Sequence, residues 1–218
     1  MPTAAGLSSS SSGLSALVKA CNRYYDLGLT QEELAQKAKF ASGSSSRSFF
    51  GPLAAWDKES GEIYKIQTDL KLAMIMLVLN DKQKPVSSRE GMKRCMETST
   101  NFKEWIEESR QDYKDMLDYL AGNDFKQVGQ LTERNALAMH ATTRTATPAF
   151  SYLTEESHKA MDFVRDLRAA GHACYFTMDA GPNVKVLCLE EDLDQLVPLF
   201  DARYRTIVSK TKDPQDED

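Results

Sequence analysis

The sequence predicts an α+β fold whose larger part reads β-α-β-β-α-β, with extra helices, over residues 70–210. Two observations carry this prediction. A strongly apolar run at 70–79 predicts a buried strand, and shorter runs at 173–178 and 184–189 are joined by Asp-Ala-Gly-Pro-Asn, which favours a turn. Between and after these runs, apolar residues recur at helical spacing. This alternation is the split βαβ, or ferredoxin-like, pattern.

Residues 1–69, which precede this pattern, are predicted to contain two helices and two serine-rich loops. The chain opens with Pro-Thr-Ala-Ala-Gly and a serine run, which lead into a helix ended by Gly28. The apolar residues at helical spacing in this helix are Leu14, Leu17, Cys21 and Tyr24. Thr30 and Glu33 have the spacing of a capping box, which predicts a second helix that ends near Lys39.

A second serine cluster, residues 42–48, follows the second helix and contains Arg47. A flexible linker is one interpretation of each serine run. The other is an anion site, because a Gly/Ser segment at a helix N-terminus offers N–H groups and hydroxyls, and arginine grips carboxylate or phosphate in a bidentate fork. The Walker pattern G-x-x-x-x-G-K-[ST] is absent from the sequence. For Arg47 alone, a solvated surface charge is the alternative.

Capping residues, glycines and a proline delimit the elements of the larger part. Ser87 and Glu90 have capping-box spacing, and Gly122 and Gly171 favour helix ends. Pro198 is an unusual residue inside the last helix. The predicted elements are helices at 87–98, 102–121, 124–139, 154–170 and 192–202, a last strand at 205–209 and an acidic, disordered tail at 211–218. The aromatic and methionine stripes of these helices are interpreted as core.

The composition excludes several classes of protein. With 218 residues, 41% of them apolar and 27% charged, the chain is globular rather than disordered or collagen-like. Its longest clean apolar run, residues 72–79, is far shorter than the roughly 20 residues of a membrane helix, and residues 1–30 show no secretory signal. The net charge of −5 argues against a nucleic-acid binder but allows a small anionic substrate.

Cysteine usage predicts a cytoplasmic protein with reduced thiols. None of the 4 cysteines forms a C-x-x-C pair and the 3 histidines are scattered, so a structural zinc site is not expected. If Met178 pairs with Val184, Cys174 lies opposite Cys188 on neighbouring strands. We interpret that pair as packing, because disulfides are rare in the cytoplasm.

Several strings, taken together, resemble one family. The opening PTAAGLSSSSSG is similar to the second, phosphate-binding motif of the GHMP small-molecule kinase superfamily. The strings ASGSSSRSFFGPLAAWD, VSSREGMKRCMETS, NALAMHAT and CYFTMDAGPNVKVL resemble the diphosphomevalonate decarboxylases, in family order over residues 1–210. The resemblance implies a GHMP-type two-domain fold. Residues 1–69 would be a truncated ATP-binding domain that shares its architecture with a ribosomal protein, and residues 70–210 the C-terminal domain.

The activity that the resemblance implies is that of an ATP-dependent carboxy-lyase in isoprenoid synthesis, on the mevalonate pathway. With ATP and Mg²⁺, the tertiary 3-hydroxyl of mevalonate 5-diphosphate is phosphorylated, and phosphate and CO₂ then leave to give isopentenyl diphosphate. Phosphate leaves readily where hydroxide does not, and collapse of the carboxylate relieves the positive charge that develops at C3. A site that holds two highly anionic molecules should be rich in donors and cations.

The resemblance also implies roles for individual residues. The implied ligands of the ATP phosphates are Gly6, Ser9, Ser10, Ser11 and Ser12. The implied substrate-binding residues are Ser42, Ser44, Arg47, Ser88 and Arg89. Arg47 would grip the carboxylate near the catalytic Asp179, which would orient or deprotonate the 3-hydroxyl, and Ser88 would bind the diphosphate at a helix N-terminus. Without the family, Asp179 is also explained as a turn residue and Ser88 as a helix N-cap.

The sequence departs from the family pattern at its start. Family members carry a segment before the PTAAG motif, with a Tyr/Trp/Lys-containing stretch that lines the site, and this sequence shows none of it. We therefore expect a fragment, a truncated gene product or a misplaced start codon, with exposed apolar surface on the helices at 14–27 and 30–40.

Three functions stay open from the sequence. They are the decarboxylase, a non-catalytic module that binds a diphosphate or a partner, and, least favoured by the charge, a nucleic-acid-binding domain. Neither a nucleic acid nor a membrane is expected as partner. Family members are often homodimers, which the resemblance leaves open here, since no feature of the sequence indicates one.

Overall fold

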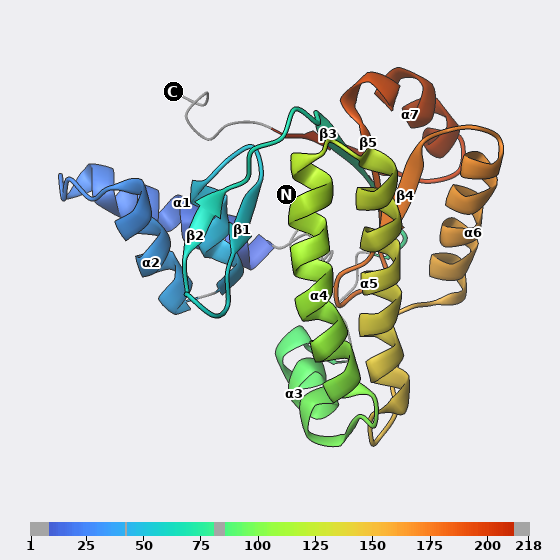
Figure 1. Ribbon diagram of the computed structural model, residues 1–218, viewed down its shortest axis with the longest axis horizontal. Helices are drawn as coiled ribbons and strands as arrows, with labels where there is room; N and C mark the ends of the chain where they lie inside the picture. Colours follow the sequence, from blue (N-terminus) through green and yellow to red (C-terminus); the bar gives the residue numbers. More distant parts are fainter. Residues whose placement is uncertain (1–8, 42, 81–85, 212–218) are drawn as a thin grey trace. The chain divides into compact units, whose positions relative to one another are not determined.

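A computed structural model of the chain describes residues 9–41, 43–80 and 86–211 (Figure 1). The chain divides into two compact units. The described residues of unit 1 are 9–41, 43–67 and 211, and those of unit 2 are 68–80 and 86–210. The predicted acidic tail lies outside the described residues, except for Thr211.

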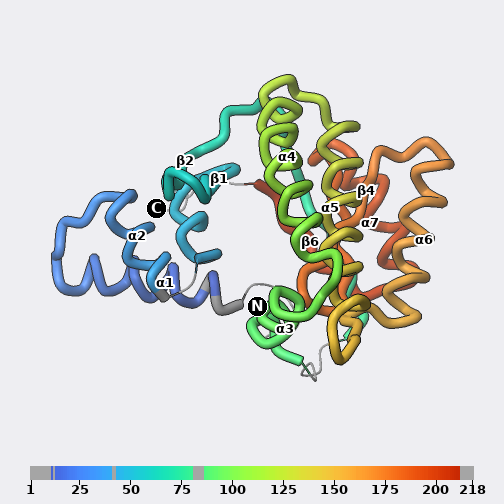
Figure 2. The backbone as a smooth tube through the Cα atoms, turned by 60° about the horizontal axis from the view of Figure 1, so that its bottom comes forward, coloured from blue at the N-terminus to red at the C-terminus, as the bar shows by residue number. Residues whose placement is uncertain are grey.

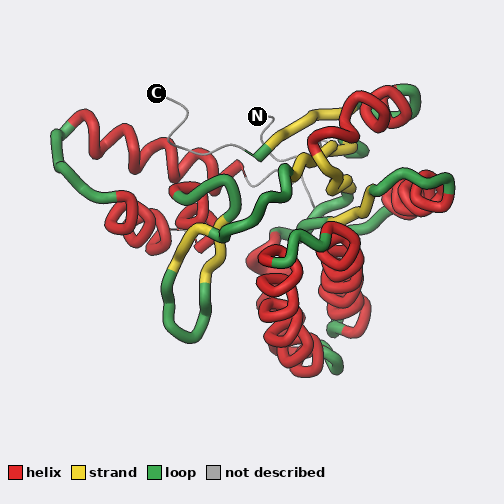
Figure 3. The backbone as a smooth tube through the Cα atoms, turned by 45° about the horizontal axis from the view of Figure 1, so that its top comes forward, coloured by secondary structure: helices red, strands yellow, loops and turns green. Residues whose placement is uncertain are grey.

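Unit 1 contains the two predicted helices, α1 (Ser9–Tyr24) and α2 (Gln31–Ala41). The second serine cluster is a 3₁₀ helix, η1 (Gly43–Phe49), where the sequence predicted a loop. The prediction also missed an antiparallel hairpin of β1 (Ala54–Trp56) and β2 (Ile63–Lys65), which is drawn in yellow in Figure 3. These strands are only three residues long, so their apolar pattern is too short to recognise.

Among the described residues of unit 1, the apolar core is small. It is formed by Leu34, Ala35, Ala38 and Phe49. The predicted capping box of α2 is confirmed, because Thr30 Oγ1 accepts from Glu33 N (3.2 Å) and Glu33 Oε2 accepts from Thr30 N (2.8 Å). The predicted exposed apolar surface is also confirmed, with large exposed side chains at Leu17, Tyr24, Tyr25, Leu27 and Phe40.

Unit 2 contains a four-stranded antiparallel sheet in the order β4-β5-β3-β6. Its strands are β3 (Leu72–Leu77), β4 (Cys174–Thr177), β5 (Val184–Leu189) and β6 (Thr206–Lys210). Numbered along the chain, this order is that of the ferredoxin-like fold, which confirms the predicted pattern.

The predicted pairing of the strands on either side of the Asp179 turn, β4 and β5, is also confirmed. Cys174 lies opposite Cys188, and both thiols are free and fully buried. Burial raises the pKa of Cys174 to about 11 and that of Cys188 to about 12. Both thiols therefore stay protonated at neutral pH and act as small apolar side chains.

The helices of unit 2 follow the predicted order. They are α3 (Ser88–Thr98), α4 (Phe102–Ala121), α5 (Phe125–Thr145), α6 (Glu155–Ala169) and α7 (Leu193–Asp201), with a short 3₁₀ turn, η2 (Glu190–Asp192), before α7. The one large difference is that α5 continues beyond Met139 to Thr145. Within this extension, the buried hydroxyls of Thr142 and Thr143 donate to carbonyls three residues earlier, which satisfies them inside the helix.

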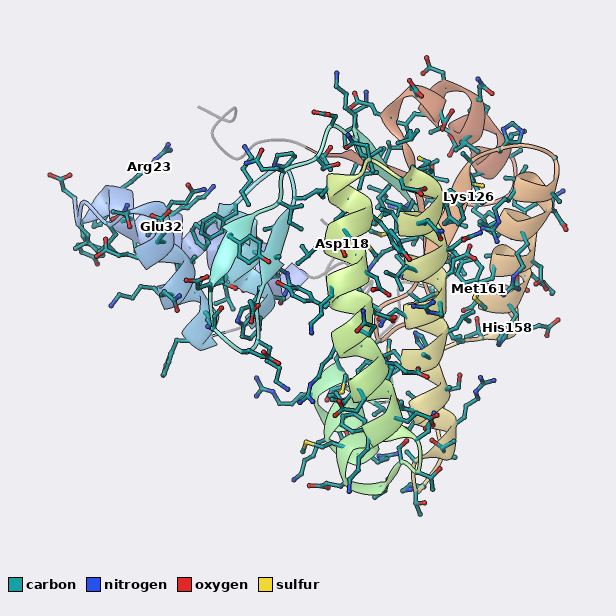
Figure 4. The ribbon with its side chains drawn as sticks, in the orientation of Figure 1. Arg23, Glu32, Asp118, Lys126, His158 and Met161 are labelled. Carbon is teal, nitrogen blue, oxygen red and sulfur yellow. The ribbon has the colours of Figure 1, made fainter. Side chains whose placement is uncertain are left out.

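The core of unit 2 lies between the sheet and helices α6 and α7. Ile75 and Val186 of the sheet and Leu196 of α7 are completely buried there. On α6, Met161 faces this core while His158, about one turn away, is exposed (Figure 4). Helices α4 and α5 form an antiparallel pair (Figure 2), and no described helix is long and apolar enough to cross a membrane.

Candidate functional site

The predicted site residues fall into two groups, one in each unit. Ser11, Ser44 and Arg47 belong to unit 1, while Ser88, Arg89 and Asp179 belong to unit 2. Gly6 and Ser42 lie outside the described residues, as do the side chains of Ser9, Ser10 and Ser12.

The first serine run opens helix α1 rather than forming a loop before it, since α1 begins at Ser9. No acidic residue lies in its first turn. The first backbone N–H groups of a helix have no partner inside the helix, and they carry the positive end of the helix dipole. This helix start is therefore suited to an anion such as a phosphate.

Helix α1 contacts the second serine segment through one buried hydroxyl, that of Ser15. Ser15 Oγ lies within hydrogen-bond distance of the carbonyl oxygens of Ser11 (2.8 Å) and Ser45 (3.1 Å). Ser46 Oγ donates to the Gly43 carbonyl (2.7 Å). Some of the serines thus have a structural role, which the family resemblance did not indicate.

The exposed side of η1 carries Ser44 and Arg47. Among the described residues, no ion pair to Arg47 is found, so its guanidinium is available for an anionic ligand. Ser45, in contrast, is completely buried, and its hydroxyl has no hydrogen-bond partner within the described part of the chain.

The N-terminus of α3 presents the second predicted anion site. Ser87 is the N-cap, with its Oγ accepting from Glu90 N (3.1 Å), so the alternative that Ser88 is the N-cap is wrong. Ser88 and Arg89, in the first turn, are exposed. The acidic Glu90 is paired with Arg94 (2.9 Å), which offsets its charge at this helix start.

Asp179 lies in the turn between β4 and β5, and this turn is fixed by contacts with several elements. His140 Nε2 lies 3.2 Å from the Asp179 carbonyl oxygen, and Ser157 Oγ donates to the Pro182 carbonyl (2.6 Å). Asn183 Oδ1 accepts from Leu79 N (2.8 Å), beyond the end of β3. Three buried polar side chains therefore hold main-chain groups at this turn.

His140 is buried and neutral. Desolvation lowers its pKa to about 4, against weaker opposing effects that include its hydrogen bond to the Asp179 backbone. The neutral ring can hold the Asp179 carbonyl only if Nε2 carries the proton and donates it. Its Nδ1 is then an acceptor, and it has no partner among the described residues.

Tyr152 connects this turn to the start of α3. Its ring meets that of His140 edge-on, with centroids 6.2 Å apart, and its hydroxyl donates to the Ser87 carbonyl (3.0 Å). Gly91 leaves room for this contact, because a Cβ there would lie 2.1 Å from the tyrosine Oη. The structure therefore brings the Ser88–Arg89 segment and the Asp179 turn into one connected neighbourhood.

The Asp179 side chain is half exposed, with 54% of its surface accessible, and its Oδ2 forms an ion pair with Lys185 Nζ. A cavity of about 550 Å³ opens beside it. Helix α4 lines the cavity with Trp105, Tyr113 and Met116, and helix α5 with Asn135 and Met139. Asp179 thus combines a fixed backbone with an accessible carboxylate, an arrangement typical of a catalytic or binding residue.

The sequence analysis missed His140, Tyr152 and Lys185. His140 stands in the string NALAMHAT and Lys185 in MDAGPNVK, but both were used only to recognise the family. Lys185 carries a signal of its own, because a lysine in an otherwise apolar strand needs a partner for its charge. Tyr152 lies in the loop after α5, and no sequence pattern indicates its contacts with His140 and Ser87.

Two family models match the chain. The model described as "Mevalonate 5-diphosphate decarboxylase C-terminal domain" matches residues 74–217, and the model described as "Diphosphomevalonate decarboxylase-like N-terminal domain" matches residues 1–66.

Relatives of this kind are found among known proteins and structures. A diphosphomevalonate decarboxylase of Candida albicans is 32% identical over 91% of this chain and 58% of its own. The structure of mevalonate pyrophosphate decarboxylase from Streptococcus pyogenes is 71% identical, with a TM-score of 0.93, over 98% of this chain and 67% of its own.

A third relative was solved with ligands. It is described as "MDDEF in complex with MVAPP, AMPPCP and Magnesium" and is 41% identical, with a TM-score of 0.87, over 95% of this chain and 67% of its own. The chain spans little more than half the length of the curated relatives that it matches.

Proposed function

The chain belongs to the mevalonate diphosphate decarboxylase family, and from this membership we propose that it acts in the ATP-dependent decarboxylation of mevalonate 5-diphosphate to isopentenyl diphosphate. The observation that carries the proposal is the Asp179 carboxylate, which is half exposed on a turn fixed by His140 and linked through Tyr152 to an anion-binding helix start. A reacting hydroxyl and a diphosphate in one molecule match these two features.

In unit 2, we assign the substrate's two ends to separate groups. Ser88, Arg89 and the first N–H groups of α3 bind the diphosphate, where the helix dipole favours negative charge. Asp179 accepts the hydrogen bond of the 3-hydroxyl and orients that oxygen for phosphorylation. The contact of His140 with the Asp179 carbonyl holds the backbone of the turn during this step.

In unit 1, we assign the nucleotide and the substrate carboxylate to the serine-rich segments. The start of α1 fits the phosphates of ATP, since it has no acidic side chain in its first turn. Ser44 and Arg47 are exposed, and Arg47 is suited to a bidentate grip on the carboxylate. We also propose residues 1–69 and 70–210 as parts of the family's N-terminal and C-terminal domains.

A relative binds MVAPP, AMPPCP and magnesium together, which supports ATP and Mg²⁺ here. When bound, they supply the phosphoryl group and neutralise its charge. No group of three or more His, Cys, Asp or Glu side chains that could hold a metal ion occurs among the described residues. This fits an ion that is held mainly through substrate phosphates.

Turnover with a defined substrate tests the proposal. The full chain is given ATP, Mg²⁺ and mevalonate 5-diphosphate, and the release of ADP and CO₂ is measured. Asp179→Asn, which keeps the size of the side chain, is expected to lower kcat by at least about 100-fold. Asp118→Asn on α4 is the matched control, because Asp118 is exposed and lies outside the site.

Two results would contradict the proposal. Equal turnover by Asp179→Asn and Asp118→Asn would remove Asp179 from the reaction. Binding of the diphosphate without turnover would favour the alternative, a non-catalytic module. The proposal also includes a cytoplasmic location and a homodimer, and sedimentation at the 24.4 kDa monomer mass would contradict the dimer.

A further inference from the structure

We propose that Lys185 is a positioning residue for Asp179: it is the buried counter-ion that fixes one carboxylate oxygen and leaves the other directed to substrate. This inference rests on the role proposed for Asp179. It deepens that role, because it explains how an exposed side chain keeps a single orientation.

The backbone of the turn is already fixed, so only the side chain needs a further contact. His140 from α5, Ser157 from α6 and Asn183 within the turn hold main-chain groups. None of these bonds involves the Asp179 carboxylate. An aspartate side chain can rotate about two bonds. An exposed carboxylate on a rigid turn can therefore still occupy several rotamers.

Lys185 supplies that contact from β5. It lies opposite Thr177 of β4, and its side chain is only 10% exposed. A buried ammonium is costly unless it is paired, and Asp179 Oδ2 is its carboxylate partner in the described structure. The chain therefore pairs one carboxylate oxygen with a buried cation, while 54% of the Asp179 side-chain surface stays accessible.

The neighbouring charges do not compete for Lys185. The acidic group on the α4 side of the cavity is Asp112, and it is bonded by Arg134 and by Asn135 Nδ2 (2.8 Å). Tyr113 lines the same wall, and the neighbouring His140 on α5 is neutral. The Asp179–Lys185 ion pair is thus separate from the Asp112–Arg134 pair on α4 and α5.

The pair has asymmetric consequences for stability. Loss of Asp179 leaves a buried ammonium without a partner, whereas loss of Lys185 leaves a half-exposed carboxylate that water can solvate. Asp179→Ala should therefore lower the urea midpoint of unit 2, and adding Lys185→Met should raise it again. A lysine that served only in packing would give additive losses. Should Asp179→Ala fail to fold, a folded double variant supports the pair and an unfolded one overturns it.

Lys210 and Glu190 form the matched control. They are also a lysine–carboxylate pair of unit 2 (2.8 Å), but their side chains are 48% and 34% exposed. For this pair, Glu190→Ala should lower the urea midpoint of unit 2 only a little. Adding Lys210→Met to Glu190→Ala should not raise the midpoint again. If the second substitution raised the urea midpoint equally in both pairs, burial of Lys185 would not be the cause of that recovery.

Catalysis gives the second test. Lys185→Met should lower kcat by about 100-fold while KM changes little, since Lys185 orients Asp179 without touching substrate. Lys185→Arg, which keeps the charge, should recover part of this loss, and Lys210→Met should behave like the unsubstituted chain. Full kcat in Lys185→Met would overturn the proposal. If the unsubstituted chain shows no turnover, the proposed function fails, while the unfolding comparison still decides the pair.

Discussion

The two units hold their candidate site residues in different ways. In unit 2, buried polar side chains fix the turn of Asp179 above an extensive apolar core. In the described part of unit 1, the apolar cluster is small, and the buried Ser15 hydroxyl joins α1 to η1. Phe40 of α2 is 98% exposed, although a side chain of this kind is normally at least partly buried.

The site residues of unit 2 are held by elements of a large core, whereas those of unit 1 are held mainly by local contacts. Unit 2 can set the geometry of its own residues, because His140 and Ser157 reach the Asp179 turn from α5 and α6, which contribute residues to the core. Unit 1 sets its geometry through few apolar contacts and several local hydrogen bonds, each of which contributes only about 1 kcal/mol. We therefore expect the stability of the two units to differ, and the following predictions test this.

The largest expected effect comes from matched leucine truncations in the two cores. Leu196→Ala should cost about 3–5 kcal/mol, because Leu196 is completely buried in unit 2. Leu34→Ala should cost about 2 kcal/mol, because Leu34 lies at the rim of the small cluster and is 9% exposed. Urea unfolding of both variants measures the difference.

Tryptophan fluorescence can follow each unit separately. Trp56 lies on β1 of unit 1 and Trp105 on α4 of unit 2, and the chain has 2 tryptophans in all. In a Trp105→Phe background the signal reports unit 1, and in a Trp56→Phe background it reports unit 2. If both leucine variants shift both signals equally, the units unfold as one and the comparison fails.

The second prediction concerns acid and is confined to unit 2. The pKa of His140 is about 4 in the folded chain, against 6.5 as its ordinary value. The unfolded chain therefore binds more protons between these values. The stability from neutral His140 is complete above pH 6.5 and is lost as the pH falls to 4, by on the order of 3 kcal/mol.

His140→Gln separates this effect from general acid unfolding. The glutamine amide can still donate to the Asp179 carbonyl, but it does not titrate. Its unfolding free energy should change less than that of the unsubstituted chain between pH 7 and pH 4, as measured by urea titration at each pH. Parallel losses in the two proteins would mean that other groups account for the acid sensitivity.

The third prediction uses one helix glycine from each unit. A Cβ at Gly129 of α5 would lie 2.0 Å from the ring of Tyr175, which is buried and held by Phe125 and Arg168. Gly129→Ala should therefore cost about 1–3 kcal/mol. Gly13 of α1 has open space around it, so Gly13→Ala should stabilise unit 1 by up to about 1 kcal/mol. Thermal unfolding would contradict this view if both changes acted with the same sign.

Much of unit 2 could be predicted from its sequence, because its elements are long and carry strong local signals. Thr154 caps α6 as its spacing with Ser157 indicates, and the register that places Cys174 opposite Cys188 follows from the turn between the strands. Less of unit 1 could be predicted. Its hairpin strands have three residues each, and the serines of η1 were assigned to a loop although Ser45 and Ser46 are fully buried.

The roles of the site residues were predicted from the family resemblance and not from local sequence patterns. Sequence spacing alone explains Asp179 as a turn residue, since nothing local shows that His140, 39 positions earlier, holds its carbonyl. Lys185 was not predicted either, although a single lysine in a buried strand indicates that its charge needs a partner. Contacts between residues distant in the chain depend on packing, which local patterns do not contain.

The smallest expected effects come from two matched helix caps, and they separate local from global stability. Thr30 caps α2 in unit 1 and Thr154 caps α6 in unit 2, each accepting a backbone N–H bond of 3.2 Å. Either threonine replaced by alanine should cost about 1 kcal/mol. The consequence should differ, because Leu34 and Ala35, in the first turns of α2, belong to the small core of unit 1.

Hydrogen exchange distinguishes the two consequences. In Thr30→Ala, fraying of the first turn of α2 reaches the core, so amide protection should fall throughout the described part of unit 1. In Thr154→Ala, the core beneath α6 is extensive, and the loss of protection should stay within the first turn of that helix. Loss of protection confined to the first turn in both variants would mean that the small core of unit 1 holds its elements as firmly as the large core of unit 2.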